Sequence, residues 1–181
     1  MIFTPTPLQG SFVIDIDVLK DDRGWFARTF CKEEFEKIGH HAEWMQMNHS
    51  FTSKKGTIRG MHFQLPPFEE IKMVRCIAGA VYDVIIDIRK NSKTFLQYVG
   101  TELSAENKKM LYIPKGFAHG FQTLSDNAEL IYHHSQFYKQ GVESGIRYND
   151  PTINIQWTLQ AVNVSARDKN HPFINNNFKG I

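Results

Sequence analysis

The sequence predicts an all-β protein, either a sandwich or a barrel, with a few short helices. Short stretches in which apolar and polar residues alternate recur at roughly ten-residue spacing, which is typical of chains built from many strands. Breaks that contain Gly, Asn, Pro or Ser separate them, as at Ala78–Ala80 and Lys90–Ser92. An aromatic share of 13%, including 14 Phe, also favours strands. The chain has no linker and no change of composition, so we expect one domain over residues 1–181.

The N-terminal part predicts two strands and a helix. Residues 12–19 alternate, with Ile14 and Ile16 on one face and Asp15 and Asp17 on the other. A turn at residues 20–24 leads to a second strand over residues 25–30. Residues 32–38 have the spacing of a short helix, and Gly39 is a typical helix stop.

The rest of the chain predicts strands almost throughout. Residues 81–89 give the clearest pattern, in which an apolar face alternates with a face that carries Asp83 and Asp87. After Gly145 the pattern is irregular, with a turn at 149–151, an anchoring Trp157 and a loose terminus around residues 175–177. Further strands are expected at 44–50, 57–63, 72–77, 95–102, 111–113, 118–123 and 129–137.

Charge and cysteine content exclude several classes of protein. A formal net charge of +2 and the lack of a basic cluster argue against nucleic acid as a partner. No apolar run has the length of a signal peptide or a membrane span, so no membrane partner is expected. Cys31 and Cys76 are too few for a disulfide framework. We therefore expect a cytoplasmic protein with both thiols reduced.

The stretch Arg59–Gln64 is the first candidate for chemistry. It places His62 beside Arg59 on a predicted strand, Pro66 and Pro67 end that strand, and Lys72 follows at the start of the next one. A histidine in a strand is more often a hydrogen-bonded core or surface residue. A strand of this kind can, however, aim an imidazole and a guanidinium into one cavity, and the other candidate segments favour such a site.

The segment Pro114–Phe121 is the second candidate. Its Pro-x-Gly-x-x-His core resembles the second sequence motif of cupins, in which the strand after the turn presents a histidine, here His119, to the barrel interior. The His-x-His pair of metal-binding cupins is missing after His62. His62, His119 and Glu69 or Glu70 make only a thin ligand set, and Arg59 and Lys72 disfavour a divalent ion, so we expect no metal and no cofactor.

Two further segments offer acid–base groups. Tyr132 lies on a predicted strand, and its phenol is protonated at neutral pH and able to donate a proton, although a core tyrosine is the commoner case. The adjacent His133 and His134 are interpreted as surface residues or as indirect supports of the site. Asp168, far along the chain, has the chemistry to orient the imidazole of His62 and to stabilise its cation.

Together these residues resemble the dTDP-4-dehydrorhamnose 3,5-epimerase family over nearly the whole chain. The resemblance implies a metal-free double-stranded β-helix, the jelly-roll or cupin fold. It also implies a homodimer that exchanges N-terminal strands and acts on a nucleotide-diphospho-4-keto-6-deoxy sugar. The matching pieces are Asp22–Phe26, Gln46–Ser50, Arg59–Gln64, Lys72–Arg75, Pro114–Phe121, Tyr132, Gly145–Pro151 and Ser165–Asp168.

The resemblance also implies a role for each candidate residue. His62, paired with Asp168, matches the base, Tyr132 matches the acid, and Lys72 matches the cation near the developing enolate oxygen. Positions that match substrate contacts comprise Arg23, Arg59, His119 and Arg167 around the nucleotide and diphosphate, Gln46 and Asn48 at the base or ribose, and Phe26, Tyr138 and Glu143.

The chain departs from the family pattern at two positions. Arg28 stands where the family usually has a glutamate that contacts the nucleotide, so the identity of the nucleotide is open. Tyr148 replaces a tryptophan. The alternatives to a 3- and/or 5-epimerase are a metal-free 3,4-ketoisomerase, a non-catalytic sugar-nucleotide-binding cupin and a metal-dependent cupin oxygenase.

Overall fold

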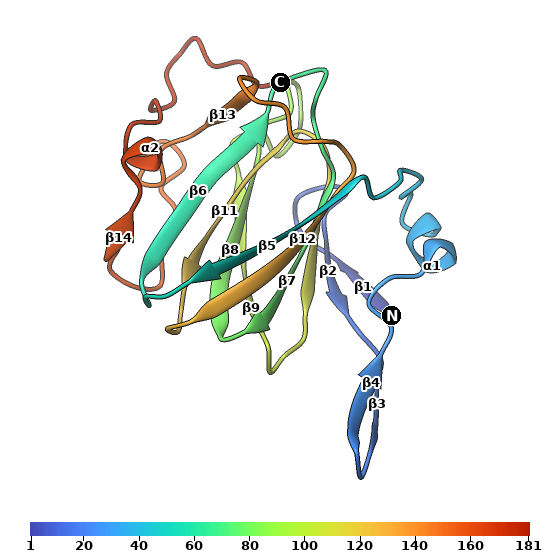
Figure 1. The fold of residues 1–181 in the computed structure, drawn as a ribbon. Helices are drawn as coiled ribbons and strands as arrows, with labels where there is room; N and C mark the ends of the chain where they lie inside the picture. Colours follow the sequence, from blue (N-terminus) through green and yellow to red (C-terminus); the bar gives the residue numbers. More distant parts are fainter.

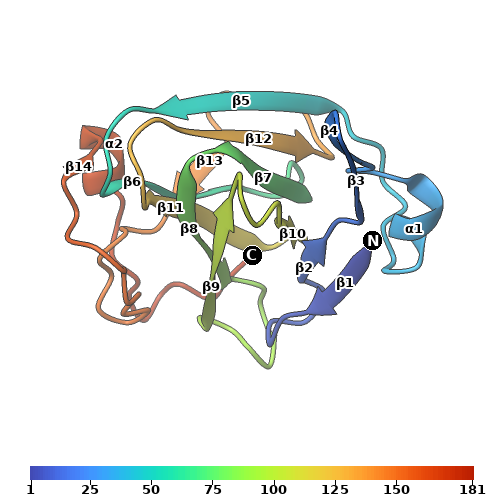
Figure 2. The ribbon, with the colours of Figure 1, turned by 90° about the horizontal axis from the view of Figure 1, so that it is seen from below.

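A computed structural model describes all 181 residues, and it consists of two β-sheets that face each other (Figures 1 and 2). The first sheet has the strand order β1-β2-β10-β7-β12-β5, and the second has the order β13-β6-β11-β8-β9, with β14 beside β6. The strands of the first sheet are β1 (Ile2–Pro5), β2 (Phe12–Asp15), β5 (Gln46–Thr52), β7 (Lys72–Ala78), β10 (Met110–Ile113) and β12 (Ala128–His134). The strands of the second are β6 (Thr57–Gln64), β8 (Ala80–Asp87), β9 (Tyr98–Ser104), β11 (Phe117–Thr123), β13 (Glu143–Gly145) and β14 (Asn163–Val164).

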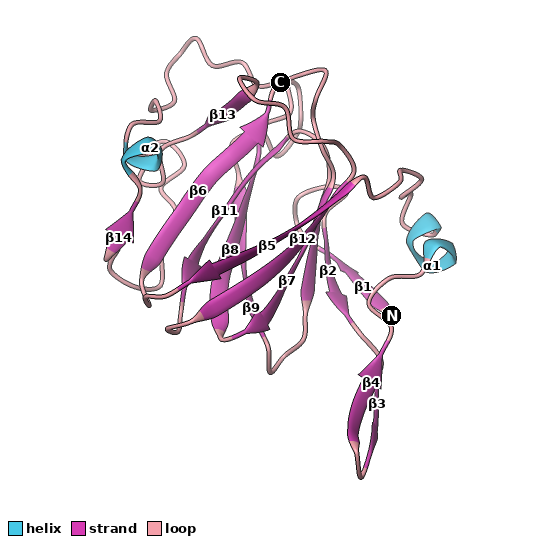
Figure 3. Ribbon diagram, viewed as in Figure 1, coloured by secondary structure: helices cyan, strands magenta, loops and turns pink.

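A two-stranded hairpin and two short helices complete the chain (Figure 3). The strands β3 (Val18–Asp21) and β4 (Gly24–Ala27) form a separate hairpin, and the helices are α1 (Lys32–Glu36) and α2 (Ala166–Lys169). Neighbouring strands of the two main sheets are antiparallel except for β14 and β6. The all-β prediction and the jelly-roll arrangement are thus confirmed. Neither helix has the length and apolar character needed to cross a membrane.

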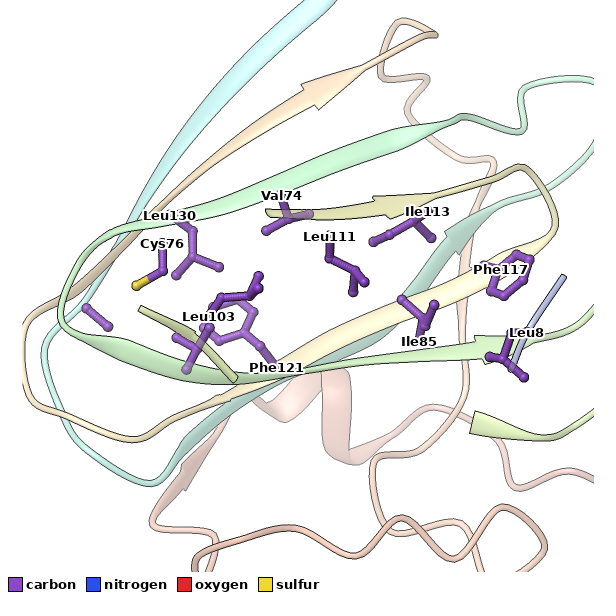
Figure 4. Packing of buried hydrophobic residues seen from close by; sticks show 12 residues of the cluster. Leu8, Val74, Cys76, Ile85, Leu103, Leu111, Ile113, Phe117, Phe121 and Leu130 are labelled. Carbon is purple, nitrogen blue, oxygen red and sulfur yellow. The ribbon is translucent and has the colours of Figure 1, made fainter. Parts of the chain in front are cut away.

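The space between the sheets holds the main hydrophobic core (Figure 4). Val74 and Leu130 from the first sheet pack there with Ile85, Leu103 and Phe121 from the second. All of these side chains are buried, and such dense packing fixes how the two sheets face each other.

The outer face of the second sheet is also buried, because the chain after Gly145 folds over it. Val84 and Ile86 on β8 pack there with Ile153, Phe178 and the C-terminal Ile181. The predicted loose terminus is therefore wrong: the N–H of Ile181 donates to the carbonyl of Ile88, and the N–H of Lys90 donates to the carbonyl of Ile181. The alternation in β8 thus separates two cores rather than a core and a solvent face.

Helix α1 covers part of the first sheet. Phe35 is fully buried and packs with Ile14, Met73 and Tyr112. The predicted helix stop at Gly39 is confirmed, since Gly39 has φ +84 and the N–H groups of Gly39 and His40 donate to carbonyls of the last turn.

The main difference from the predicted elements lies in the N-terminal region. The single strand expected over residues 12–19 is divided between β2 and β3, with a break at residues 16 and 17. β3 then leaves the sheet and pairs with β4, which ends at Ala27 rather than at Phe30. As Figure 1 shows, this hairpin protrudes from the body of the protein. Alternation alone specifies a strand but not the sheet to which it pairs.

β6 and β11 approach each other closely beside the site described below. A Cβ on Gly60, which has φ +126, would lie 2.6 Å from the Cα of Gly120. The pairing of the two strands shifts register between His119 and Phe121, and His119 stands directly opposite His62. Only glycine fits so close a contact, and the contact brings the two histidines side by side.

Candidate active site

A cavity of about 570 Å³ opens between the two sheets. Strands β5, β7 and β12 form one wall, and β6, β11 and β13 form the other. Nine residues predicted from the sequence line this cavity, namely His62, Lys72, Tyr132, Gln46, Asn48, Arg59, His119, Tyr138 and Glu143. The cavity is large enough for a nucleotide-sized ligand.

His62 and Asp168 form a hydrogen-bonded pair on the wall of the second sheet. Nε2 of His62 lies 2.7 Å from Oδ1 of Asp168, and the other carboxylate oxygen accepts the N–H of Gly60. Burial of Asp168 tends to raise its pKa, but the hydrogen bonds from His62, Gly60 and Ser165 outweigh this effect, so that the pKa lies below its usual value.

The ionised Asp168 fixes the tautomer of a neutral His62. Since a carboxylate only accepts, Nε2 of His62 carries the hydrogen and donates it, which leaves the lone pair on Nδ1. The imidazole is one-third exposed toward the cavity, whereas Asp168 is almost fully buried behind it. This arrangement suits a general base.

Tyr132 faces His62 from the opposite wall, on β12 of the first sheet. Its hydroxyl lies 3.0 Å from that of Ser50, and its ring packs edge-on against His119. Burial raises the pKa of the Tyr132 phenol well above its usual value, so that the phenol keeps its proton at neutral pH. It is a group that can donate a proton to a bound substrate.

Lys72 is held by a buried carboxylate. Nζ of Lys72 lies 3.0 Å from Oε1 of Glu70, and Oε2 of Glu70 lies 2.7 Å from Nδ1 of His134. Burial of Glu70 tends to raise its pKa, but the hydrogen bond with His134 and the charge of Lys72 lower it overall. The site therefore contains a positioned cation with an ionised partner.

Arg59 and His119 occupy the inner wall. Nη2 of Arg59 donates to the carbonyl of Phe51 at 3.0 Å. Nε2 of His119 lies 2.9 Å from Asp83, and both side chains are buried. A second histidine–carboxylate pair therefore lies beside the first.

The rim of the cavity is polar. The hydroxyl of Tyr138 donates to Glu143 at 3.0 Å, and Arg167 forms an ion pair with the same carboxylate at 3.2 Å. Arg167 itself does not line the cavity, but its position beside Glu143 places it at the entrance.

Arg23, Phe26 and Arg28 are not brought to this cavity. All three belong to the hairpin or follow directly after it; Arg23 pairs with Asp21, and Arg28 lies 3.4 Å from Glu34. Within one chain these residues lie apart from the other candidates, because the hairpin points away from the body (Figure 1), so their predicted contact with the nucleotide stays a prediction.

One cluster has the composition of a metal site. The ligand atoms of His62, Asp168 and His171 lie within 4.8 Å of one another. The set considered from the sequence is not assembled, since His119 pairs with Asp83 and Glu70 pairs with Lys72 and His134. Asp168 already holds His62 through a short hydrogen bond, so this cluster is best described as an acid–base pair with a neighbouring imidazole.

Sequence reasoning missed several supporting residues. The strand pattern puts Asp83 on one face of its strand but does not link it to His119, and no pattern links Ser50 to Tyr132 or marks His171. The signal for Asp83 was available, because a carboxylate among buried apolar residues needs a partner. Contacts of Ser50 and His171 depend on the pairing of strands and on the path of the tail, which spacing does not show.

Comparison with known proteins decides the family. The model of the family described as dTDP-4-dehydrorhamnose 3,5-epimerase matches residues 5–176. The chain belongs to this family. It is therefore related to isomerases that share its cupin-like fold, as the resemblance in the sequence implied.

Individual relatives agree with this placement. The family member from Shigella flexneri, a dTDP-4-dehydrorhamnose 3,5-epimerase, is 46% identical over 166 residues, which cover 91% of each chain. The crystal structure of the Bacillus anthracis enzyme with TDP and PPi bound superposes with a TM-score of 0.93 at 36% identity and covers 96% of this chain and 99% of that one. The Legionella pneumophila enzyme in complex with dTDP-4-keto-L-rhamnose gives a TM-score of 0.90 at 37% identity, with 95% and 92% covered.

Proposed function

We propose that the protein is an epimerase that inverts C3 and/or C5 of a nucleotide-diphospho-4-keto-6-deoxyhexose, in deoxysugar biosynthesis. The observation that carries the proposal is the placement of the His62–Asp168 pair and the Tyr132 phenol on opposite walls of one cavity. A base on one side and an acid on the other are what inversion of a carbon centre requires. The names and bound ligands of the relatives support a dTDP-linked sugar as the substrate.

The proposed reaction begins with loss of a proton next to the C4 ketone. Nδ1 of His62 takes this proton, the C–H electron pair forms a C=C bond, and the carbonyl electrons move to the C4 oxygen. Asp168 stabilises the resulting imidazolium. Lys72 stabilises the enolate oxygen, and this matters because a proton next to a ketone is too weakly acidic for imidazole alone.

Tyr132 completes the inversion. Its hydroxyl donates a proton to the opposite face of the same carbon, while the electrons of the enolate return to the carbonyl. The phenolate then recovers its proton, and His62 releases the one it took, so substrate and product are isomers. The high pKa of Tyr132 favours the protonated form that this step needs.

The remaining cavity residues support binding of the nucleotide diphosphate. Arg59 offers a planar, permanently charged group that matches phosphate oxygens, and His119 stands beside it. Gln46 and Asn48 present amides suited to a base or ribose. At the rim, the hydroxyl of Tyr138 donates to Glu143, and Arg167 forms an ion pair with the same carboxylate, so these three side chains offer further polar contacts to the substrate.

We extend the proposal to a cytoplasmic homodimer of single-domain chains. The hairpin carries exposed Leu19, Trp25 and Phe26, and an apolar surface of this kind on a protruding element favours a partner. In an exchanged dimer, the hairpin of one subunit would bring Arg23, Phe26 and Arg28 to the cavity of the other. Both cysteines are free thiols, in keeping with a reducing compartment.

The test is solvent exchange in deuterium oxide. We expect the enzyme to incorporate deuterium at C3 and/or C5 of dTDP-4-dehydro-6-deoxy-D-glucose, with product stereochemistry read by NMR. GDP- and CDP-linked 4-keto sugars, assayed in parallel, test whether Arg28 alters the choice of nucleotide. Absence of label at both carbons with every substrate would contradict the proposal, and a 3-keto product would identify a ketoisomerase.

Two variants separate the half-reactions. His62→Ala should abolish exchange, whereas Tyr132→Phe should lower formation of the inverted product by roughly 10²–10⁴-fold, the usual contribution of a positioned acid. Tyr112→Phe is a matched control, because Tyr112 is also buried and hydrogen-bonded, to His40, but lies outside the cavity. Equal loss of product in Tyr112→Phe would show that Tyr132→Phe acts through folding rather than through proton transfer.

A further inference from the structure

A continuous line of hydrogen bonds runs along the wall of the first sheet and ends at Lys72. The distances between successive partners are 3.0, 2.9, 3.3, 2.7 and 3.0 Å. The line starts at the backbone N–H of Tyr138 and passes through the side chains of Gln46, Asn48, His134, Glu70 and Lys72. It therefore links two amides at the proposed nucleotide end of the cavity to the cation at the proposed ketone end.

The direction of every bond in this line follows from its first member. A backbone N–H can only donate, so the atom of Gln46 that faces Tyr138 is its oxygen, and the amide nitrogen of Gln46 is left to donate to Oδ1 of Asn48. Asn48 then turns its own nitrogen toward Nε2 of His134. Since that nitrogen donates, Nε2 of His134 must accept.

The tautomer of His134 is thereby fixed. With its lone pair on Nε2, the neutral ring carries its hydrogen on Nδ1 and donates it to Oε2 of Glu70 at 2.7 Å. A doubly protonated His134 would set two donors face to face at Asn48. Glu70 accepts from both sides and is the only acceptor-only group in the line, which agrees with its lowered pKa.

We propose that His134 is a positioning residue that, as the neutral Nδ1–H tautomer, holds Glu70 and through it aims Lys72 at the ketone oxygen. This inference rests on the proposed epimerase function. A lysine side chain has several rotatable bonds, and a fixed counter-ion removes most of that freedom. Because Glu70 shares its charge between Lys72 and His134, it restrains the ammonium group of Lys72. The ammonium group can still interact with a second negative group, the enolate oxygen.

The surroundings of His134 are consistent with this role. The charged and titratable groups that face it are Glu70 just before β7, Lys72 at the start of β7, and Tyr132 and His133 from its own strand; Asn48 on β5 is neutral. The ring of His134 stacks on Tyr132 with a centroid distance of 6.1 Å. The same histidine therefore bonds to Glu70, which holds the cation, and packs against Tyr132, the proposed acid.

The first experiment does not depend on activity. With ¹⁵N-labelled histidine at pH 7.5, the ring signals that disappear in His134→Phe identify His134 among the eight histidines. We expect the pattern of the neutral Nδ1–H tautomer, with an unprotonated Nε2. An Nε2–H tautomer or a cationic ring would overturn the proposal even if the enzyme is active.

The second experiment is a kinetic comparison of three variants with dTDP-4-dehydro-6-deoxy-D-glucose. His134→Phe should lower kcat about 10- to 100-fold, the usual effect of losing a hydrogen bond to a charged group. His134→Asn places an amide nitrogen near the former position of Nδ1, so its kcat should return to near the wild-type value. Both variants lose the hydrogen bond to Asn48, so both should have a higher KM than wild type. His133→Phe is the matched control, since His133 lies on the other face of β12 against Trp44, and it should leave kcat unchanged.

The outcomes are distinguishable from failure of the proposed function. A wild-type protein without turnover would contradict the epimerase assignment, while the NMR result would still decide the tautomer of His134. An unchanged kcat in His134→Phe, or an equal loss in folded His134→Phe and His134→Asn, would overturn the positioning role. Should His134→Phe not fold, Glu70→Gln replaces it, and a kcat within twofold of wild type in that variant would refute the proposal.

Discussion

At the scale of single residues, Asp168 shows how one buried carboxylate serves both stability and the site. Its carboxylate accepts hydrogen bonds from His62 and from the N–H of Gly60, and its own backbone N–H donates to Oγ of Ser165 at the helix cap. We expect Asp168→Asn to lower the free energy of unfolding at pH 7 by about 2 kcal/mol, because a hydrogen bond to a charged group is lost.

The effect of Asp168→Asn on the free energy of unfolding should depend on pH. The pKa of Asp168 is depressed in the folded protein, so its contribution to the free energy of unfolding is fully present above its pKa in the unfolded chain, about 3.9, and is lost as the pH falls through its pKa in the folded protein. The difference between wild type and Asp168→Asn, measured by urea unfolding, should therefore be largest near neutral pH and shrink in acid. Asp22→Asn, at an exposed turn, is the control. A difference that grows below pH 4 would contradict this account.

The residues of the site were predictable from the sequence to different degrees. His62, Tyr132 and Lys72 belong to strands whose alternation was readable, and the structure places all three in one cavity. The contact of Asp168 with His62 rested on resemblance alone, since no local pattern specifies a contact across 106 positions. Glu70 and His134 meet because β12 pairs with β7, and the pairing of strands depends on the whole fold rather than on spacing.

At the scale of elements, the C-terminal tail illustrates where local patterns mislead. The run Asn175–Asn177 is polar and predicted a loose end, yet Phe178 stacks on Phe95 at 6.1 Å and Ile181 bonds to Ile88. Strand positions followed from a period of two, which is set by the backbone. The course of the tail depends on the apolar outer face of the second sheet. The residues of that face lie far from the tail in the sequence, so the local pattern around residues 175–177 does not indicate them.

Removal of the Phe178 side chain should show what this contact contributes. Phe178 is partly buried, so Phe178→Ala should destabilise the protein by roughly 2 kcal/mol, less than for a fully buried phenylalanine. The corresponding drop in the melting temperature is about 5 °C for a chain of this length. Calorimetry measures both quantities, with Phe137→Ala, whose side chain is 56% exposed, as the control. Equal melting temperatures for wild type and Phe178→Ala would mean that the tail is loose after all.

At the scale of the whole molecule, the two sheets bring nine candidate residues into one cavity, but Arg23, Phe26 and Arg28 lie on or beside a hairpin that points away from it. The sequence predicted these side chains as site residues through resemblance, and it also predicted exchange of N-terminal strands between subunits. In this structure the hairpin lies away from the cavity of its own chain, so the two predictions agree if the hairpin acts in the cavity of a partner subunit. The oligomeric state thus decides whether the candidate site is complete.

Mixing of two inactive variants tests this directly. If each cavity uses His62 from one subunit and Arg23 from the other, a mixed dimer of His62→Ala and Arg23→Ala holds one doubly altered site and one intact site. After co-refolding of equal amounts, about half of the dimers are mixed and about a quarter of all sites regain activity, which the deuterium-exchange assay measures against wild type. Each variant refolded alone is the control. If both residues serve the same cavity from one chain, every site in every dimer carries one substitution, and no activity returns.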